Sequence, residues 1–295
     1  MRLASWNMNH HNRIAMRGVE QLYDAGHDVL CLQEVPEHLL PELARLPGDL
    51  FACDEYTDTT GLTSKLVILS RRPIQAHTVH QHKEYYSLRN WWGGMREGIS
   101  FHHVDLLVGN QPTRIFNLHL PLNAPPRARM REWMRVKRRF RPDGHNIMCG
   151  DFNAFADPLW SLLVAPFFGY GFKLRDRLMN ERQSLRRFIQ RYQLENPFAR
   201  WRTQMHLPHQ LDFILLSKGI EALNANRWPD RLGSDHWPLS LKLKLPVVKE
   251  KAETRGKQLA NKLIASSREM MPRAMQELKE LKEKFDRERE AASKR

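Results

Sequence analysis

The chain has 295 residues, of which 41% are hydrophobic, enough for one large α/β domain with an appendage or for two modest domains. Lys and Arg number 47 against 33 Asp and Glu, and the net charge of +14 favours polyanionic partners such as nucleic acid or an anionic membrane surface. Three cysteines exclude a disulfide-stapled scaffold and indicate a reducing compartment.

The sequence contains no stretch with the apolar length of a membrane-spanning helix, which needs about 20 residues. The longest apolar region, Leu159–Phe172, is broken by a serine, a proline and two glycines. The amino terminus lacks the long apolar stretch of a signal peptide. We therefore expect a cytoplasmic protein without a transmembrane segment.

The first elements are predicted to be strand, helix and strand. Met1–Asn9 alternates as a strand, with Asn7 near its carboxyl end. Arg13–Ala25 has the apolar spacing of a helix, and Asp28–Leu32 is a buried strand that closes in Glu34. Open α/β sheets place ligands at such strand ends, although Glu34 taken alone is better explained as the first residue of a solvated loop.

The section 77–94 interleaves aromatic and cationic residues, including Trp91 and Trp92. This pattern suits base stacking or insertion into a groove, and a hairpin with a small core of its own is the alternative. Its histidines lack the cysteine or carboxylate pattern of a tetrahedral zinc site. Met95–Phe101 and Asp105–Val108 are predicted to be paired strands.

A further strand, Arg114–Leu120, contains His119 near its end, and Arg127–Arg141 is predicted to be a helix. The helix carries many cations and one acid, Glu132, which is far from the balanced charge of an ordinary solvated face. We interpret it as a surface that contacts the phosphate backbone of nucleic acid. Its contact residues are predicted to be Arg127, Arg129, Arg131, Arg135, Lys137 and Arg138.

The central stretch is Ile147–Asn153, where an apolar strand ends at Gly150. Asp151 and Asn153 follow at a spacing of two, so they leave an extended chain on the same side. A carboxylate there can hold or deprotonate water, and an amide N–H can stabilise charge on a phosphoryl oxygen. Two solvated polar residues in a turn are the alternative.

Two more polar groups border the last predicted strands. Asp212 opens an apolar strand that extends to Leu216, and Asp235 and His236 lie in a tight turn before the final strand, Leu239–Leu245. A turn that feeds a core strand holds its side chains rigidly.

Pro246 marks a change in composition, and residues 247–295 are highly charged without Trp or Tyr. A heptad-like apolar seam runs through them, weakened by Pro272. We therefore divide the chain into a catalytic domain, 1–246, and a charged helical extension, 247–295. Residues 250–292 are expected to dock on a partner protein or a second copy, with packing on their own domain as the alternative.

The polar ends of these strands favour a hard cation, Mg²⁺ or Mn²⁺, because they offer oxygen ligands without a cysteine set. Two histidines, His119 and His236, remain for proton transfer. This is equipment for metal-assisted phosphoester hydrolysis.

The order of these motifs resembles that of the endonuclease/exonuclease/phosphatase superfamily over about residues 1–245. The motifs are Trp6-Asn7, Gln33-Glu34, Asn117-Leu118-His119, Gly150-Asp151-Phe152-Asn153, Leu211-Asp212-Phe213 and Ser234-Asp235-His236. The resemblance implies an α/β fold, a four-layer α/β/β/α sandwich of two mixed β-sheets with flanking helices.

The same resemblance implies roles for the site residues. Glu34 would bind the metal, with Asn7 and Asp235 close by. Asp151 would position or activate water, and Asn153 would fix the phosphate. His236, oriented by Asp212, would be the general base or the group that polarises the phosphate.

Within the superfamily, the histidine at position 119 is similar to that of pancreatic-type deoxyribonucleases, sphingomyelinases and several phosphatases. Abasic-site endonucleases generally have a tyrosine at this position. In the deoxyribonucleases a glutamate after a basic residue supports this histidine, and Arg96-Glu97 matches that step, so Glu97 is the expected support. Secreted members carry a signal peptide and disulfides, neither of which we expect in this chain.

The first hypothesis is an Mg²⁺- or Mn²⁺-dependent endonuclease that cleaves DNA with little sequence preference. The second is a phosphodiesterase or phosphatase for lipid or nucleotide phosphoesters, and RNA is a variant of the first. A catalytically silent scaffold is the third, against which the intact motif set argues.

Overall fold

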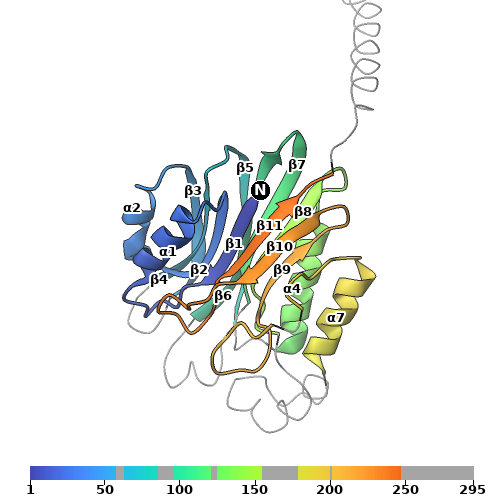
Figure 1. Cartoon of the computed structure of the whole chain (residues 1–295). Helices are drawn as coiled ribbons and strands as arrows, with labels where there is room; N and C mark the ends of the chain where they lie inside the picture. Colours follow the sequence, from blue (N-terminus) through green and yellow to red (C-terminus); the bar gives the residue numbers. More distant parts are fainter. Residues whose placement is uncertain (58–62, 86–95, 121–124, 155–178, 200, 247–295) are drawn as a thin grey trace, which may run out of the picture. The chain divides into compact units, whose positions relative to one another are not determined.

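Two β-sheets packed face to face, with helices on their outer surfaces, make up the part of the chain that the computed structural model describes (Figure 1). The described residues are 1–57, 63–85, 96–120, 125–154, 179–199 and 201–246, with the backbone alone at 56–57, 81–85 and 96–100. Trp91, Trp92 and the extension 247–295 lie outside them. The predicted sandwich of two mixed sheets and flanking helices is confirmed.

Both sheets combine parallel and antiparallel pairs. The first sheet has the order β10 (Glu221–Arg227), β11 (Leu239–Lys244), β1 (Arg2–Asn7), β2 (Val29–Pro36), β4 (Thr63–Ser70) and β3 (Asp49–Thr57). The second has the order β6 (Arg96–Val108), β7 (Gln111–His119), β8 (His145–Asp151) and β9 (Asp212–Leu216), with β5 (Ile74–Tyr85) on the free side of β6. Two residue pairs between β3 and β6 connect the sheets, Tyr56 with Glu97 and Thr57 with Arg96.

Alternation along the strands creates the layers, because successive side chains point to opposite faces of a sheet. In β2, Cys31 faces the core between the sheets, whereas Leu30 and Leu32 face outward. In β8, Ile147 faces the same central core and Met148 faces the opposite outer layer. Strands covered on both faces are apolar almost throughout.

Helices cover the two outer faces. Helix α1 (Ala15–Asp24), the short η1 (Glu37–Leu39) and α2 (Leu40–Leu43) pack on the first sheet, and α4 (Pro126–Arg138) and α7 (Glu181–Arg191) pack on the second (Figure 1). Helix α1 buries Val19 and Leu22 there, and α4 buries Trp133 and Val136. Each helix therefore uses one apolar stripe.

Some strands differ from the sequence-based expectation. The predicted pair of strands at 95–101 and 105–108 is one continuous strand, β6, because it pairs with β5 on one side and with β7 on the other. No glycine or proline interrupts 99–108, so nothing in the chain forces a turn there. Strands β3 and β10 were not predicted, and β5 was foreseen only as part of the alternative, a hairpin within 77–94.

The strand directions bring the polar ends together at one end of the sandwich. The carboxyl ends of β1 and β2 lie side by side, as do those of β7 and β8. Strand β9 runs antiparallel to β8, so it begins where β8 ends, with Asp151 opposite Asp212. Among the helices of the described ranges, none has the length and apolarity needed to cross a membrane.

Candidate active site

The Glu34 carboxylate is held by donors from two neighbouring segments. Asn7 Nδ2 donates to its Oε1 at 3.0 Å, and His10 Nδ1 lies 2.9 Å from its Oε2. Glu34 has φ of +53° at a β-bulge between Leu32 and Val35. Because the left-handed region is strained for a residue with a Cβ, this conformation is maintained by the surrounding contacts.

A glycine turn places Asp151 and Asn153. Gly150 has φ of +131°, and a Cβ on it would lie 1.8 Å from the backbone oxygen of Leu118. After the turn, Asn153 N donates to Asp151 Oδ1 at 2.9 Å, and Asn153 Nδ2 donates to the carbonyl of Leu120 at 2.8 Å. The turn therefore requires glycine and fixes both polar residues.

Three nitrogen atoms surround Oδ2 of Asp151. Asn7 Nδ2 donates to it at 3.2 Å, and the Nε2 atoms of His119 and His236 lie 3.6 Å and 3.8 Å from it. These nitrogens come from β1, from β7 and from the turn before β11. Positively polarised groups from three separate segments thus converge where an anion would be stabilised.

Both histidines are held from behind by a buried carboxylate. His236 Nδ1 donates to Asp212 Oδ2 at 2.8 Å, and His119 Nδ1 donates to Glu55 Oε1. Each ring therefore directs its Nε2 toward Asp151. A carboxylate at one ring nitrogen fixes the orientation and tautomer of the imidazole.

These pairs keep both rings protonated at neutral pH. Burial would lower the pKa of His236, but the charge and hydrogen bond of Asp212 raise it to about 10. Burial also opposes protonation of His119, yet the charge and hydrogen bond of Glu55 hold its pKa well above its usual range. Two imidazolium groups therefore face Asp151.

The turn before β11 is anchored to β1. Ser234 Oγ donates to the carbonyl of Asn7 at 2.8 Å and accepts a hydrogen bond from the backbone N of His236 at 3.0 Å. Trp6 Nε1 donates to the carbonyl of His236 at 3.3 Å. These contacts join segments from opposite ends of the domain.

The donor set around Glu34 fits a hard divalent cation. Burial would raise the pKa of Glu34, but the hydrogen bond from His10 and the charge of His119 lower it, so the carboxyl group is ionised. Asn7 Nδ2 bridges the carboxylates of Glu34 and Asp151. Such oxygen ligands without thiolates suit Mg²⁺ or Mn²⁺.

Asp235 lies beside this set and is hydrogen-bonded through both oxygens. Oδ1 accepts from Asn9 Nδ2 at 2.9 Å, and Oδ2 accepts from Gln204 Nε2 at 3.0 Å. Burial would raise its pKa, but the charge of His236 and these amide hydrogen bonds lower it. An ionised Asp235 therefore adds negative charge next to His236.

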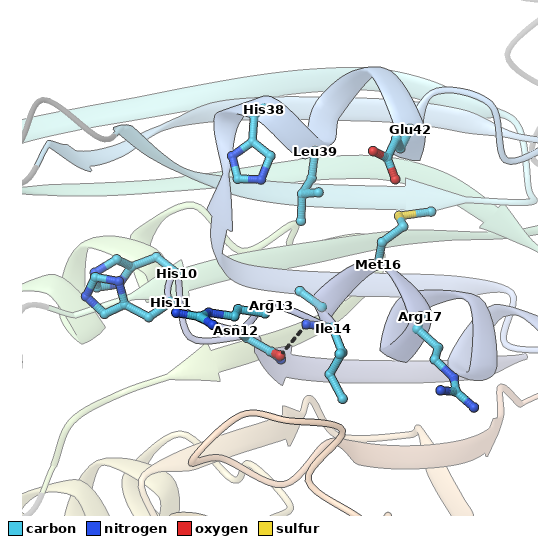
Figure 2. A pocket seen from close by; sticks show the side chains of 11 residues that line it. His10, His11, Asn12, Arg13, Ile14, Met16, Arg17, His38, Leu39 and Glu42 are labelled. Carbon is cyan, nitrogen blue, oxygen red and sulfur yellow. Dashed lines mark hydrogen bonds between the residues drawn. The ribbon is translucent and has the colours of Figure 1, made fainter.

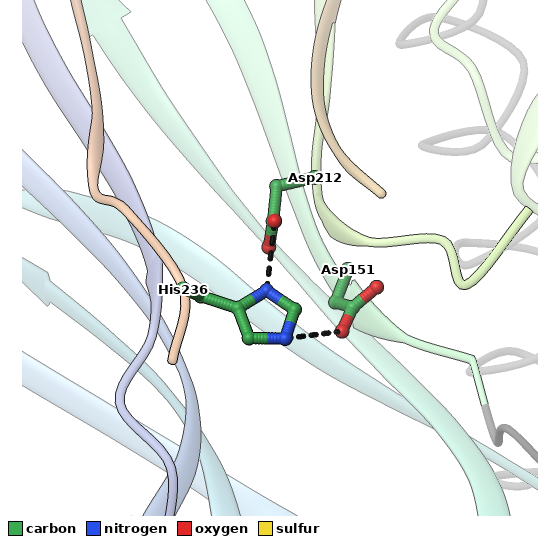
Figure 3. A group of neighbouring side chains, drawn as sticks. All are labelled: Asp151, Asp212 and His236. Carbon is green, nitrogen blue, oxygen red and sulfur yellow. Dashed lines mark hydrogen bonds and ion pairs between the residues drawn. The ribbon is translucent and has the colours of Figure 1, made fainter. Parts of the chain in front are cut away.

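Asp151, Asp212 and His236 also form a compact group (Figure 3), with one ligand atom of each within 4.8 Å of the others. Their geometry suits proton handling better than metal binding. His236 Nδ1 is occupied by Asp212, and the charge of an imidazolium repels a cation. The prediction that Glu34 binds the cation stays a prediction.

A groove of about 440 Å³ lies between the segment that begins at His10 and the one that contains His38 and Glu42 (Figure 2). Its lining includes His10, whose ring contacts Glu34, and the exposed side chains of His11, Arg13 and His38. Glu42 is an acid in the same lining. The groove therefore offers cationic and ring-bearing side chains directly beside the cluster.

The structure brings together most of the residues that the motifs predict. One cluster contains Asn7, Glu34, His119, Asp151, Asn153, Asp212, Asp235 and His236. The side chain of Glu97 lies outside the described residues, and its supporting role stays a prediction. In the described part of the chain, the carboxylate at His119 Nδ1 is Glu55, which the motifs missed.

Glu55 carries a weak sequence signal. It has the same parity as Cys53 along β3, and both are buried, while Asp54 between them is exposed. An acid at an inward-facing strand position marks a polar site. The motif pattern also missed Asn9 and His10, which hold Asp235 and Glu34.

The predicted phosphate-contacting helix is only partly available at the surface. Arg127, Arg131 and Arg138 are exposed. Arg129 is fully buried and forms a two-pronged ion pair with Glu181 at 2.7 Å and 2.8 Å, so it does not belong to the exposed face. The other two predicted contact residues interact with side chains of this protein. Arg135 forms an ion pair with Glu132, and Lys137 lies over the rings of Phe140 and Tyr192.

Comparisons with known proteins agree with this geometry. The fold is similar to an endonuclease/exonuclease/phosphatase from Beutenbergia cavernae, with 16% identity, a TM-score of 0.60, and coverage of 83% of this chain and 71% of that one. A mannosyl-6-phosphatase from Bacteroides thetaiotaomicron matches with 16% identity, a TM-score of 0.53, and coverage of 83% and 100%. The endonuclease domain of TRAS1, a telomere-specific non-LTR retrotransposon, matches with 13% identity, a TM-score of 0.53, and coverage of 83% and 98%.

At these identities, the structural matches show a shared fold. No curated protein sequence matches the chain. The sequence profile of the Endonuclease/Exonuclease/phosphatase family matches residues 4–236, a span that contains every residue of the cluster. The chain belongs to the endonuclease/exonuclease/phosphatase family, whose members are phosphoester hydrolases.

Proposed function

We propose that this protein is a divalent-metal-dependent phosphodiesterase that cleaves DNA endonucleolytically with little sequence preference. The observation that carries the proposal is the convergence of Asn7, His119 and His236 on one oxygen of Asp151. A phosphodiester needs this combination of a base for water and cationic donors for the phosphoryl oxygens.

Glu34, with Asn7 and Asp235 close by, is the residue that would hold Mg²⁺ or Mn²⁺. When bound, the ion supplies charge neutralisation at the phosphoryl group and lowers the pKa of water. Glu34 is suited to this role because it is ionised. Its neighbours orient the carboxylate before any ligand arrives.

The other residues handle protons and the phosphate. Asp151 orients the attacking water and accepts its proton, while the backbone N–H of Asn153 fixes Asp151 Oδ1. His236, held by Asp212 with its pKa raised to about 10, donates to a phosphoryl oxygen. Of the two roles that the motifs left open for His236, the raised pKa favours polarising the phosphate over acting as a base.

The polymer preference rests on charge. The chain carries +14, and α4 exposes Arg127, Arg131 and Arg138, which suits a phosphate backbone without reading base edges. The carboxylate behind His119 also supports the pancreatic-type deoxyribonuclease branch over the abasic-site branch, with Glu55 as the carboxylate observed.

Supercoiled plasmid DNA, incubated with the full chain and Mg²⁺ or Mn²⁺, tests the proposal. We expect nicked and then linear plasmid, no reaction in EDTA, and loss of cleavage by a factor of about 100 or more in Asp151→Asn and His236→Asn. Intact plasmid together with hydrolysis of a nucleotide or lipid phosphoester would overturn the assignment to DNA. Faster cleavage of RNA than of DNA would replace DNA by RNA as the substrate.

A second candidate function is hydrolysis of a lipid or nucleotide phosphoester. The groove beside Glu34 favours it, because about 440 Å³ accommodates a small headgroup. Arg13 and His38 would meet the anionic part of such a substrate. The double variant Arg13→Gln/His38→Gln separates the two functions. If this second candidate is correct, the variant loses more small-substrate hydrolysis than plasmid cleavage.

A further inference from the structure

Three arginines surround the ring of Trp237, the residue that directly follows His236. The guanidinium carbon lies 4.4 Å from the ring centroid in Arg227, 5.6 Å in Arg231 and 5.9 Å in Arg202. Arg202 and Arg227 are exposed, and Arg231 and Trp237 are half-buried. These four residues are called the Trp237 cluster below.

Backbone and sulfur atoms hold the arginines in place. Arg202 Nε donates to the carbonyl of Gln204 at 2.9 Å, and Arg227 Nη1 donates to the carbonyl of Arg202 at 3.0 Å. Arg231 contacts Met205 Sδ. The guanidinium groups are therefore positioned by neutral acceptors.

Among the residues that the structure describes, no carboxylate forms an ion pair with any of the three arginines. The adjacent acid, Asp230, accepts from the backbone of Leu232 instead. Three like charges gathered around one ring repel one another, and the face of the ring relieves only part of this repulsion. A bound polyanion would reduce the remaining repulsion among the three arginines.

The cluster shares its backbone with the catalytic residues. Gln204 pairs with His236 in an isolated β-bridge and donates to Asp235, and Trp237 N donates to the carbonyl of Thr203 at 2.9 Å. Thr203 Oγ1 in turn accepts from the backbone N of Asp212. The Trp237 cluster is therefore tied by hydrogen bonds to the segment that carries Asp235 and His236.

We propose that the Trp237 cluster binds the phosphodiester backbone of the nucleic-acid strand next to the scissile phosphate. This rests on the proposed function and adds a docking surface to it. Guanidinium groups bind phosphate oxygens in pairs of hydrogen bonds, and a nucleic-acid strand presents one charge for about every 3.4 Å of its axis. Several neighbouring phosphates can thus meet several neighbouring arginines.

The geometry favours nucleic acid over an anionic membrane. An interfacial tryptophan inserts its ring among lipids. Trp237 is half-buried, and the guanidinium group of Arg227 lies 4.4 Å from the centre of its ring, so the ring is a poorer membrane anchor than a fully exposed one. Guanidinium contacts to phosphates carry no sequence information.

Binding of a fluorescein-labelled DNA duplex to the full chain in EDTA, measured by anisotropy at increasing KCl, tests the proposal. The test variant is Arg202→Gln/Arg227→Gln/Arg231→Gln. The matched control, Arg45→Gln/Lys218→Gln/Lys244→Gln, removes the same charge from exposed positions outside the Trp237 cluster. We expect the test variant to bind at least about tenfold more weakly and its slope of log K against log salt to decrease in magnitude by about two to three.

The control variant is expected to keep a slope within about one unit of the wild-type slope. Equal losses in the two variants would show that net charge alone acts and would overturn the proposal, as would unchanged binding by the test variant. If the triple variant fails to fold, single Arg227→Gln decides the matter: the proposal requires a slope change of about one.

Two further arms separate the alternatives. Vesicles of phosphatidylcholine with about one-quarter phosphatidylserine are expected to bind no better than neutral vesicles, and capture by these vesicles in place of DNA would overturn the proposal. In EDTA, DNA binding is measured without the metal that cleavage requires. Failure of the full chain to bind DNA under this condition overturns the docking surface. Failure of plasmid cleavage with metal, while DNA binding remains, instead overturns the proposed function.

Discussion

Glu55 fixes two parts of the active site at once. One carboxylate oxygen accepts from His119 Nδ1, and the other accepts from the backbone N of Glu34 at 2.8 Å. It therefore orients the His119 ring and supports the left-handed conformation of Glu34. A buried acid with two such contacts affects catalysis through its neighbours.

Replacing Glu55 by Gln is expected to lower the rate of phosphodiester cleavage by about 10- to 100-fold, because the charge that keeps His119 protonated is lost. The melting temperature should change little, since the amide retains the shape of the carboxylate. Asp54→Asn is the control, because Asp54 is exposed and pairs with Lys65. Wild-type kcat in a folded Glu55→Gln variant would contradict the role of Glu55, and a loss in Glu97→Gln would support the sequence-based expectation for Glu97.

A second prediction at the residue scale concerns the stability effect of replacing Gly150. Gly150→Ala should destabilise the protein by at least about 2 kcal/mol, because it adds a backbone clash to an unfavourable φ. Gly109→Ala is the matched control: Gly109 has φ of +63°, and nothing lies within 4 Å of its added Cβ. Urea unfolding of the two variants measures the difference, and equal losses would show that the contact with Leu118 is unimportant.

Most of the cluster was predictable at the residue scale because its members border apolar strands in a fixed motif order. Glu34, Asp151 and His236 were found this way. Glu55 was not, because it lies inside β3, a strand without a motif. Its role depends on the pairing of β3 with β6, the strand next to β7. Sequence spacing cannot show such a contact between distant segments.

At the scale of elements, α4 shows why a count of charges overstates a binding surface. The helix was predicted correctly to within a few residues, but Arg129 lies inside, between α4 and α7, with Glu181. A helix packed on a sheet has a buried stripe, and this stripe includes one arginine. Its cationic residues therefore divide between surface and interior.

The buried pair yields a prediction about stability. Arg129→Met should destabilise the domain by about 3–5 kcal/mol, because it leaves the Glu181 carboxylate buried without its cation. The double variant Arg129→Met/Glu181→Leu should recover much of this loss, since an apolar pair avoids the uncompensated charge. Arg131→Gln on the exposed side is the control, with an expected change within about 0.5 kcal/mol. A single variant as stable as the control in urea unfolding would contradict the importance of the pair.

The elements that sequence patterns located best were the apolar strands of the two sheets. Strand β10 was missed because its burial is slight: Leu223 is 47% exposed, and only Ala222 and Ala225 pack on the core. A weakly buried edge strand has no clear alternation to detect. The fold class could be predicted because the motif series resembles that of one family. Edge strands could not, because they depend on pairing between distant segments.

At the scale of the whole molecule, buried neutral histidines link stability to pH. His27 is 3% exposed, and its ring nitrogens contact the carbonyl of Leu22 at 2.6 Å and Ser240 Oγ at 2.7 Å. Burial lowers its pKa below the usual value of 6.5. Protonation would remove the acceptor that Ser240 uses, so the folded state resists it.

The sign of the effect follows from proton binding. Below pH 6.5 the unfolded chain protonates His27 and the folded chain does not, so stability is retained above pH 6.5 and lost as the pH falls. The loss is at most about 1.4 kcal/mol per pH unit for one such group. His27→Gln should therefore unfold in urea with a smaller decrease in stability between pH 7 and pH 5 than the wild type. An identical pH dependence in the two proteins would contradict this account.

The central claim is that the residues around Asp151 form a metal-dependent phosphodiesterase centre. The most direct measurement is the rate of bis(p-nitrophenyl) phosphate hydrolysis by the full chain, with Mg²⁺ or Mn²⁺, with EDTA, and in the Asp151→Asn variant. The account predicts hydrolysis that requires the cation and falls by a factor of about 100 or more in Asp151→Asn. Hydrolysis that persists in EDTA, or that Asp151→Asn leaves unchanged, would contradict it.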